Sequence, residues 1–229
     1  MTLVRSLVAI AAVTVGLASA ASAQATMDTL RRGPACDRGA TVLRSQEARV
    51  RRAGDLLFGC FGRATRGREL ERTGCITGFS TSLPLCVVVA RPVLSGRWLA
   101  YATRVEQADL DAWLDISSVR VVDLRRGRRW TYDACPGSWS VTSASQTVTY
   151  HYGLAAVRRM LVTPTGTAVF SARDRRDPAK GNLICVARPG RGATVVLAES
   201  RGIDVTSLRI SGASVTWRDA GVLQSAALP

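Results

Sequence analysis

The chain has 229 residues, with 31 Lys and Arg against 17 Asp and Glu, and a formal net charge of +14. A hydrophobic content of 47% with only 21% charged residues excludes a disordered or collagen-like chain. This length suits one domain of good size or two small ones. A single histidine leaves no set of imidazoles for a metal site and little scope for histidine-dependent catalysis. We therefore predict no metal and no cofactor.

The N-terminus has the pattern of a secretory signal peptide. Arg5 supplies one positive charge, the run from Leu7 to Leu17 is apolar, and Ala21-Ser22-Ala23 is a small-residue cleavage motif. Residues 1–23 are therefore predicted to be removed, which leaves a mature chain of 24–229 with a charge of +13 (+14 less Arg5). The apolar run is too short to span a bilayer, and no later run reaches 18 apolar residues. We expect a secreted or extracytoplasmic protein without an integral membrane segment after cleavage.

Six cysteines lie in the mature part, and no two of them form a C-x-x-C pair: Cys36, Cys60, Cys75, Cys86, Cys135 and Cys185. An even number of cysteines in an oxidising compartment indicates three disulfides rather than a zinc site. Fifteen pairings are possible for six cysteines. We predict the sequential pairing, Cys36–Cys60, Cys75–Cys86 and Cys135–Cys185, because it closes local loops.

After residue 23 the apolar residues form short alternating runs bounded by Gly, Pro and Asp, which is typical of β-strands. Four segments share one layout, in which an apolar strand precedes a glycine and the third residue after that glycine is aliphatic. The pairs are Gly54 with Leu57, Gly96 with Leu99, Gly166 with Val169, and Gly212 with Val215. This layout predicts a strand, a tight turn with glycine in an unusual backbone conformation, and a second strand. Two of the units continue with a further hairpin, centred on Gly127 and on Gly192.

Four antiparallel strands per unit are the anatomy of a propeller blade, so residues 24–229 are predicted to form a single propeller-like β domain. The four repeated glycines are 42, 70 and 46 residues apart. We assign the excess in the longest interval to insertions at Glu106–Asp115 and Cys135–Gly153, and a fifth, degenerate blade within it is the alternative. Thr41–Arg44 is expected to complete the last blade beside Val222–Leu228 and so to close the ring.

Two of the units carry motifs that resemble a known repeat. Leu94-Ser-Gly-Arg-Trp-Leu-Ala-Tyr101 is followed by Val119-Arg-Val-Val-Asp-Leu124 and a glycine-containing turn, and Thr163–Phe170 repeats the first motif in a weaker form. These segments resemble the repeat of TolB-type, WD-repeat-like propellers, although the Asp that precedes the glycine there is absent from every copy. The resemblance implies an all-β, small propeller-like domain of about four blades. A β-sandwich with a similar number of strands is the alternative fold.

Two features of the sequence could carry chemistry. His151, between two tyrosines in Thr149–Gly153, would need a serine and a carboxylate to act in a hydrolase, and no G-x-S-x-G motif is present. The segment Glu106–Asp115 has alternating oxygen ligands at Asp109 and Asp111 but lacks the glycine and closing Glu of a calcium-binding loop. We expect His151 to pack in a loop and the acids to pair with nearby arginines, and we predict no catalytic residue.

The basic residues are thirty arginines and one lysine, Lys180. This ratio is typical of GC-rich codon usage, which explains the choice of arginine but not the excess of bases. The electrostatic field of such a chain would attract anionic polymers. The inserted segments add aromatic side chains that could cover one end of the ring or form a binding lip. The candidate binding residues are Arg125, Arg126, Arg128, Arg129, Trp113, Tyr150 and Tyr152.

These features favour a secreted, non-enzymatic binding or scaffolding module. Its expected partner is a protein or an anionic envelope polymer, no nucleic-acid partner is expected in the cell, and the module is expected to be a monomer. Two alternatives stay open. One is an electrostatic binder of anionic polymers through arginine-rich turns, and the other is a secreted hydrolase that uses His151.

Overall fold

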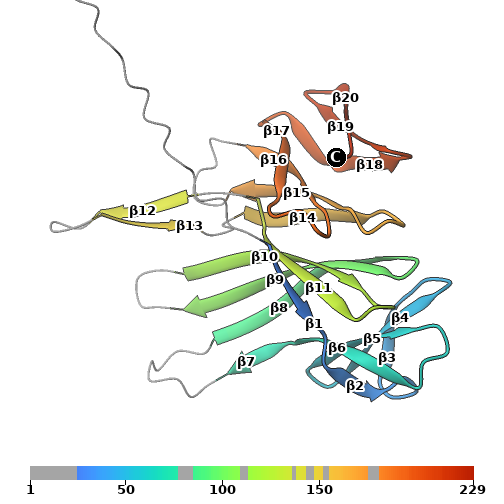
Figure 1. Ribbon diagram of the computed structural model, residues 1–229. Helices are drawn as coiled ribbons and strands as arrows, with labels where there is room; N and C mark the ends of the chain where they lie inside the picture. Colours follow the sequence, from blue (N-terminus) through green and yellow to red (C-terminus); the bar gives the residue numbers. More distant parts are fainter. Residues whose placement is uncertain are drawn as a thin grey trace, which may run out of the picture.

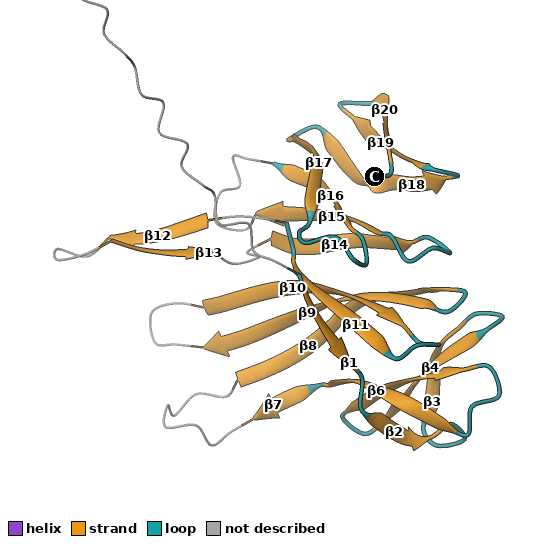
Figure 2. Cartoon of the chain, viewed as in Figure 1, coloured by secondary structure: helices purple, strands orange, loops and turns teal. Residues whose placement is uncertain are grey.

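A computed structural model describes residues 25–76, 85–108, 113–135, 138–142, 147–151, 155–174 and 181–229. The predicted signal peptide, residues 1–23, lies outside these residues. The described part is all-β, as predicted, with strands and turns but no helix (Figure 2). It therefore contains no helix long and apolar enough to cross a membrane. Every pair of neighbouring strands is antiparallel.

Besides one two-stranded hairpin, the described residues form four sheets (Figure 1). The first has the order β2-β6-β5-β4-β3, with strands Arg32–Ala35, Arg66–Arg72, Leu56–Phe61, Ala48–Ala53 and Ala40–Arg44. The second has the order β1-β11-β10-β9-β8-β7, with strands Thr26–Thr29, Arg128–Asp133, Trp113–Asp123, Trp98–Ala108, Leu85–Ser95 and Gly74–Ile76. The third runs β14-β15-β16-β17, with strands Ala155–Val162, Ala168–Asp174, Asn182–Ala187 and Val195–Ser200. The fourth runs β18-β19-β20, with strands Ile203–Ser211, Ser214–Asp219 and Val222–Ala227.

The four repeated glycines each lie in a turn between two paired strands. Gly54 joins β4 to β5, Gly96 joins β8 to β9, Gly166 joins β14 to β15, and Gly212 joins β18 to β19. Their φ angles are +60°, +55°, +93° and +58°, in the left-handed region that glycine enters without strain. The aliphatic third residue after each glycine is buried, with an exposed fraction of 2% or less. The predicted strand–turn–strand layout is therefore confirmed in all four units.

The four sheets stack face to face. Side chains alternate between the two faces of each sheet, so one sheet can pack an apolar face against each of its two neighbours. Leu99 and Tyr101 of β9 pack in a core shared with the first sheet, whereas Trp98 and Ala100 pack in a core shared with the third. The third and fourth sheets share another core, which contains Trp217. Three cores thus join consecutive sheets, and among the described residues no core joins the fourth sheet to the first.

The predicted closure of the ring by Thr41–Arg44 is wrong. These residues lie in β3, which pairs with β4 in the first sheet, so the fourth sheet has three strands and ends at β20. The N-terminal segment links the first two sheets instead, since β1 pairs with β11 and β2 pairs with β6. A local hairpin between β3 and β4 closes a short loop, which costs less entropy than pairing strands from opposite ends of the chain.

The two insertions extend hairpins. The described residues of 106–115 continue the antiparallel pairing of β9 with β10, in which Glu106 lies opposite Asp115. Within 135–153 the structure describes two strands, β12 (Ser138–Thr142) and β13 (Thr147–His151), which pair with each other. In Figure 1 this hairpin projects beside the four sheets. The described part of this insertion is therefore one hairpin and not a four-stranded fifth blade.

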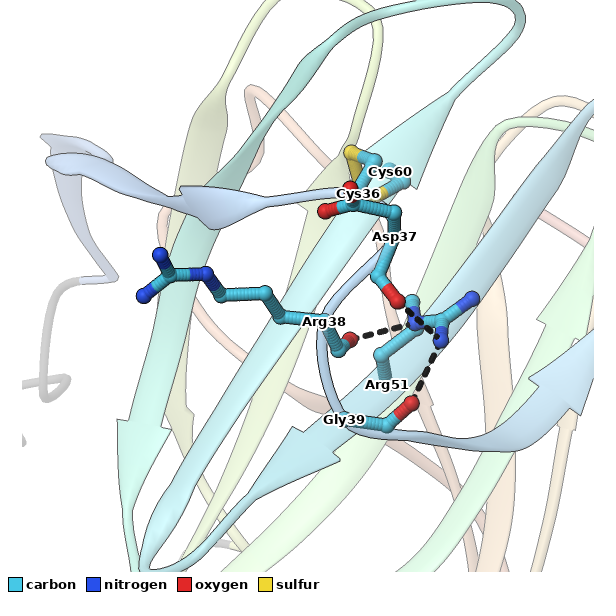
Figure 3. The surroundings of a disulfide bond; sticks show 6 residues. All are labelled: Cys36, Asp37, Arg38, Gly39, Arg51 and Cys60. Atoms are coloured by element: carbon cyan, nitrogen blue, oxygen red, sulfur yellow. Dashed lines mark hydrogen bonds between the residues drawn. A yellow bond between two sulfur atoms is a disulfide. The ribbon is translucent and has the colours of Figure 1, made fainter.

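The three disulfides have the predicted sequential pairing, and all cysteines of the described residues are bonded. Cys36–Cys60 fastens the segment after β2 to β5 within the first sheet (Figure 3). Cys75–Cys86 links the neighbouring strands β7 and β8. Cys135–Cys185 joins the end of β11 to β16, and so it ties the second sheet to the third across their shared core.

Candidate functional site

The turn between β10 and β11 carries the arginine cluster that the sequence singles out. Asp123, at the end of β10, is fully buried, and its Oδ1 accepts hydrogen bonds from the backbone N–H groups of Arg125 (3.0 Å) and Arg126 (3.1 Å). The other oxygen, Oδ2, lies 3.5 Å from Nε of Arg97. Gly127 completes the turn with a φ of +65°. A buried carboxylate thus fixes the backbone of the turn on which the arginines are mounted.

Three of the four predicted arginines of this turn are exposed. The side chains of Arg125, Arg126 and Arg128 face solvent, and Nε of Arg126 lies 4.0 Å from the buried Asp123 carboxylate. An exposed guanidinium gains little from such a distant ion pair. These side chains therefore keep their hydrogen-bond donors available for a ligand.

Arg129 is the exception, because its guanidinium is engaged in hydrogen bonds within the fold. Only 20% of its side chain is exposed, and its Nε donates to both carboxylate oxygens of Asp28, at 3.0 and 3.1 Å. Its Nη1 donates to the carbonyl of Leu70 at 2.7 Å. Burial lowers the pKa of the Arg129 guanidinium, but the hydrogen bond to Asp28 and the proximity of Tyr101 outweigh burial and raise the pKa above its ordinary value. Arg129 therefore clamps β1 and β6 to β11.

Arg51 is a second arginine whose guanidinium is used within the fold and is not free to bind a ligand. The guanidinium of Arg51 donates to the backbone carbonyls of Asp37, Arg38 and Gly39, and it holds the loop that follows Cys36 (Figure 3). The figure shows the three carbonyl groups converging on this one side chain. Arginines of this kind stabilise the fold. A ligand would be bound by arginines that make no such contacts.

A pocket of about 480 Å³ opens beside the β10–β11 turn, between the first and second sheets. Its walls come from β2, β5, β6 and the loop before β6 on one side and from Leu124 and Arg125 on the other. Two glycines allow the turn to approach this closely. A Cβ on Gly59 would overlap Cδ2 of Leu124, and a Cβ on Gly127 would lie 2.9 Å from Nε of Arg68.

Four arginines line this pocket, which we call the arginine pocket: Arg32 from β2, Arg66 and Arg68 from β6, and Arg125 from the turn. Its lining includes no Asp or Glu, and within the described part of the chain none of the four side chains makes an ion pair. Arg32 lies directly opposite Arg68 in the pairing of β2 with β6, an unfavourable position for two like charges. A bound anion would relieve that repulsion. Guanidinium groups bind carboxylate, sulfate and phosphate groups with paired hydrogen bonds.

Three of the four pocket arginines belong to no motif. Arg66 and Arg68 alternate along β6, so a period of two could have indicated that they share one face of the sheet. Arg32 joins them only because β2 pairs with β6, and no local pattern encodes that contact. Arg125 is the one pocket residue that the sequence predicts, through its cluster in the turn.

The remaining predicted binding residues are Trp113, Tyr150 and Tyr152. The backbone of Trp113 begins β10 and that of Tyr150 lies in β13, but both side chains and all of Tyr152 lie outside the described residues. Outside them as well are the groups weighed for catalysis and calcium binding: the side chain of His151, and Asp109 and Asp111. In the part that is described, no three His, Cys, Asp or Glu side chains come together to hold a metal ion. No family model, curated protein or solved structure matches the chain.

Proposed function

We propose that this protein is an extracytoplasmic, non-enzymatic binding module for anionic polymers. The observation that carries the proposal is the arginine pocket, in which Arg32, Arg66, Arg68 and Arg125 converge without a carboxylate. The other exposed arginines of the turn extend the positive surface beside it. The net charge of +13 on the mature chain (+14 less Arg5) draws a polyanion toward the protein, and the pocket binds one of its charged groups.

Secretion is part of this proposal. It is supported by the signal-peptide pattern of residues 1–23 and by the three disulfides, since disulfides form and persist in oxidising compartments. Outside the cytoplasm the polyanions in question are acidic polysaccharides and other anionic envelope polymers rather than nucleic acid. The module acts as a monomer in this proposal.

We also propose that the four sheets are the blades of a short, open propeller with the TolB-type repeat. Each sheet contains one of the four glycine hairpins, and consecutive sheets share a core in chain order. A β-sandwich is the alternative, but a sandwich has two sheets around one core. Three cores between four sheets favour the propeller.

Two paired substitutions test the arginine pocket. R66Q/R125Q removes one guanidinium from each wall, whereas R126Q/R128Q removes the same charge from the same turn outside the pocket lining. Arg129 is left unchanged because its loss would disturb the fold. On immobilised heparin, used as a sulfated probe, we expect R66Q/R125Q to elute at clearly lower salt than R126Q/R128Q.

The salt dependence gives a second readout. The slope of log K against log [NaCl] is expected to fall by about one for each lost arginine contact, as it does for phosphate contacts in nucleic acids. Equal elution of the two variants would contradict a role for the pocket. Retention of the unmutated protein that does not depend on salt would overturn the proposal as a whole.

A further inference from the structure

A second set of arginines lies where three sheet edges meet. In the described part of the chain, β14, β18 and β8 beyond Val87 each lack a partner strand on one side. Each of these strands also breaks register with the strand that follows it. The breaks lie between Ala90 and Val93 in β8, between Val157 and Arg159 in β14, and between Asp204 and Arg209 in β18. Such bulges redirect side chains and are common beside functional sites.

The residues at these breaks line one groove. A pocket of about 550 Å³ is bounded by Arg91–Val93 of β8, Arg158–Leu161 of β14, and Val205–Thr206 of β18. A second pocket of about 420 Å³ is lined by the same three strands and shares Val93 and Leu161 with the first. The two pockets therefore adjoin each other, and we call them together the three-strand groove.

One end of this groove is cationic. Arg91, Arg158 and Arg159 line it, and no Asp or Glu lines either pocket. Arg91 has a φ of +53°, a strained conformation for a residue with a side chain and one that is often found at binding sites. Nε of Arg159 is buried without a hydrogen-bond partner among the described residues. The Asp204 carboxylate lies beside this end without lining it, since its Oδ1 accepts hydrogen bonds from the backbone N–H (2.9 Å) and hydroxyl (2.7 Å) of Thr206 at the groove wall.

The other end is apolar. Leu94, Val162 and Ile210 line it, and each is partly exposed while it packs against a different one of the three inter-sheet cores. Arg209 lies at the same end, but its Nη1 donates to two backbone carbonyls of its own strand at 2.9 and 2.8 Å. The three cores thus open onto one aliphatic surface, next to three arginines for which the described residues show no ion pair.

We infer that the three-strand groove binds an anionic amphiphile, a molecule with a single carboxylate or phosphate headgroup and one apolar chain. The headgroup pairs with the three arginines, and the chain covers the aliphatic end. A small inorganic anion would leave the aliphatic surface in water, and a neutral apolar chain would leave the charges of Arg91, Arg158 and Arg159 without a counter-ion. A continuous polyanion does not suit the apolar end. This site shares no lining residue with the arginine pocket, so the two proposals can be tested independently of each other.

Isothermal titration of the mature protein with its disulfides intact tests this inference. The probes are decanoate and decyl phosphate below their micellar concentrations, butyrate as the short-chain control, and decyl maltoside as the uncharged control. R91G/R158Q removes two charges from the groove, and glycine suits the positive φ at position 91. R126Q/R128Q removes the same charge from the β10–β11 turn, and Ile210→Ser makes the apolar end polar.

We expect decanoate or decyl phosphate to bind at least tenfold more tightly than butyrate or decyl maltoside, and the tighter of the two identifies the headgroup. Both R91G/R158Q and Ile210→Ser should weaken that binding tenfold or more, while R126Q/R128Q and R66Q/R125Q leave it unchanged. Equal affinity for decanoate and butyrate would overturn the inference, because only charge would then be recognised. An equal loss in R126Q/R128Q would overturn it as well. The chain-length comparison uses the unmutated protein, so it does not depend on how well a variant folds.

Discussion

The disulfide Cys135–Cys185 offers the sharpest test of how the stacked sheets are held together. It spans 50 residues and joins the second sheet to the third, and both cysteines are buried in the core between them. By the chain-entropy relation, opening a loop of this length costs about 4 kcal/mol at 25 °C. A small domain is usually stable by only 5–15 kcal/mol, so this disulfide is a large fraction of the total.

The double variant C135A/C185A removes the cross-link and leaves two sulfur positions empty in the core. We expect it to lower the free energy of unfolding by about 4 kcal/mol or slightly more, since the empty space adds to the loop term. The matched control is C75A/C86A, which loses the same atoms but opens a loop of only 11 residues. Opening this shorter loop should lower the free energy of unfolding by about 3 kcal/mol, and its two cysteines are not buried in an inter-sheet core.

Urea unfolding followed by tryptophan fluorescence measures both variants, with the slope m checked for a change in the unfolded state. The larger loss should fall on C135A/C185A. A loss for this variant that is no larger than that for C75A/C86A would refute the reasoning, because neither loop length nor burial would then decide the contribution of the disulfide.

Three further predictions concern the core and its polar contacts. Leu99→Ala should lower the free energy of unfolding in urea by about 2–5 kcal/mol, because Leu99 is fully buried. Leu223→Ala, at a residue that is 66% exposed, should change it by less than about 0.5 kcal/mol. Similar losses for the two variants would argue against the stacked core. Arg129→Gln and Asp28→Asn should each lower the free energy of unfolding by about 1–2 kcal/mol. The double variant should lose less than the sum of the two, since both substitutions remove the same interaction. Strictly additive losses would show that the contact does not stabilise the fold. Burial raises the pKa of Tyr101 from 10 to about 12, so the stability it contributes is complete below pH 10 and about 2–3 kcal/mol of it is lost as the pH rises to 12. Tyr101→Phe should lack this part of the alkaline loss, and an unfolding profile between pH 9 and 12 identical to that of the unmutated protein would contradict the assignment.

The arginine turn of the candidate site was predictable from the sequence, but three of the four arginines of the pocket beside it were not. The turn from Asp123 to Arg128 is a local structure, held by its own aspartate and glycine, and its arginines were visible as a cluster. Arg129 follows the same cluster in sequence, yet its side chain pairs with Asp28, about a hundred residues away. Whether an arginine binds a ligand or a carboxylate of its own chain depends on such distant partners, which composition and spacing do not reveal.

Local sequence patterns predicted the all-β class, the four strand–glycine–strand hairpins and the sequential disulfide pairing. The strands and turns depend on a few neighbouring residues, through the alternation along a strand and the backbone freedom of glycine, and each cysteine pairs with the next one along the chain. The folded chain alone reveals that β3 stays in the first sheet, that β2 brings Arg32 opposite Arg68, and that three sheet edges meet at one groove. The physical reason is that pairing between distant strands is selected by the free energy of the whole packed molecule, to which each local segment contributes only a small part.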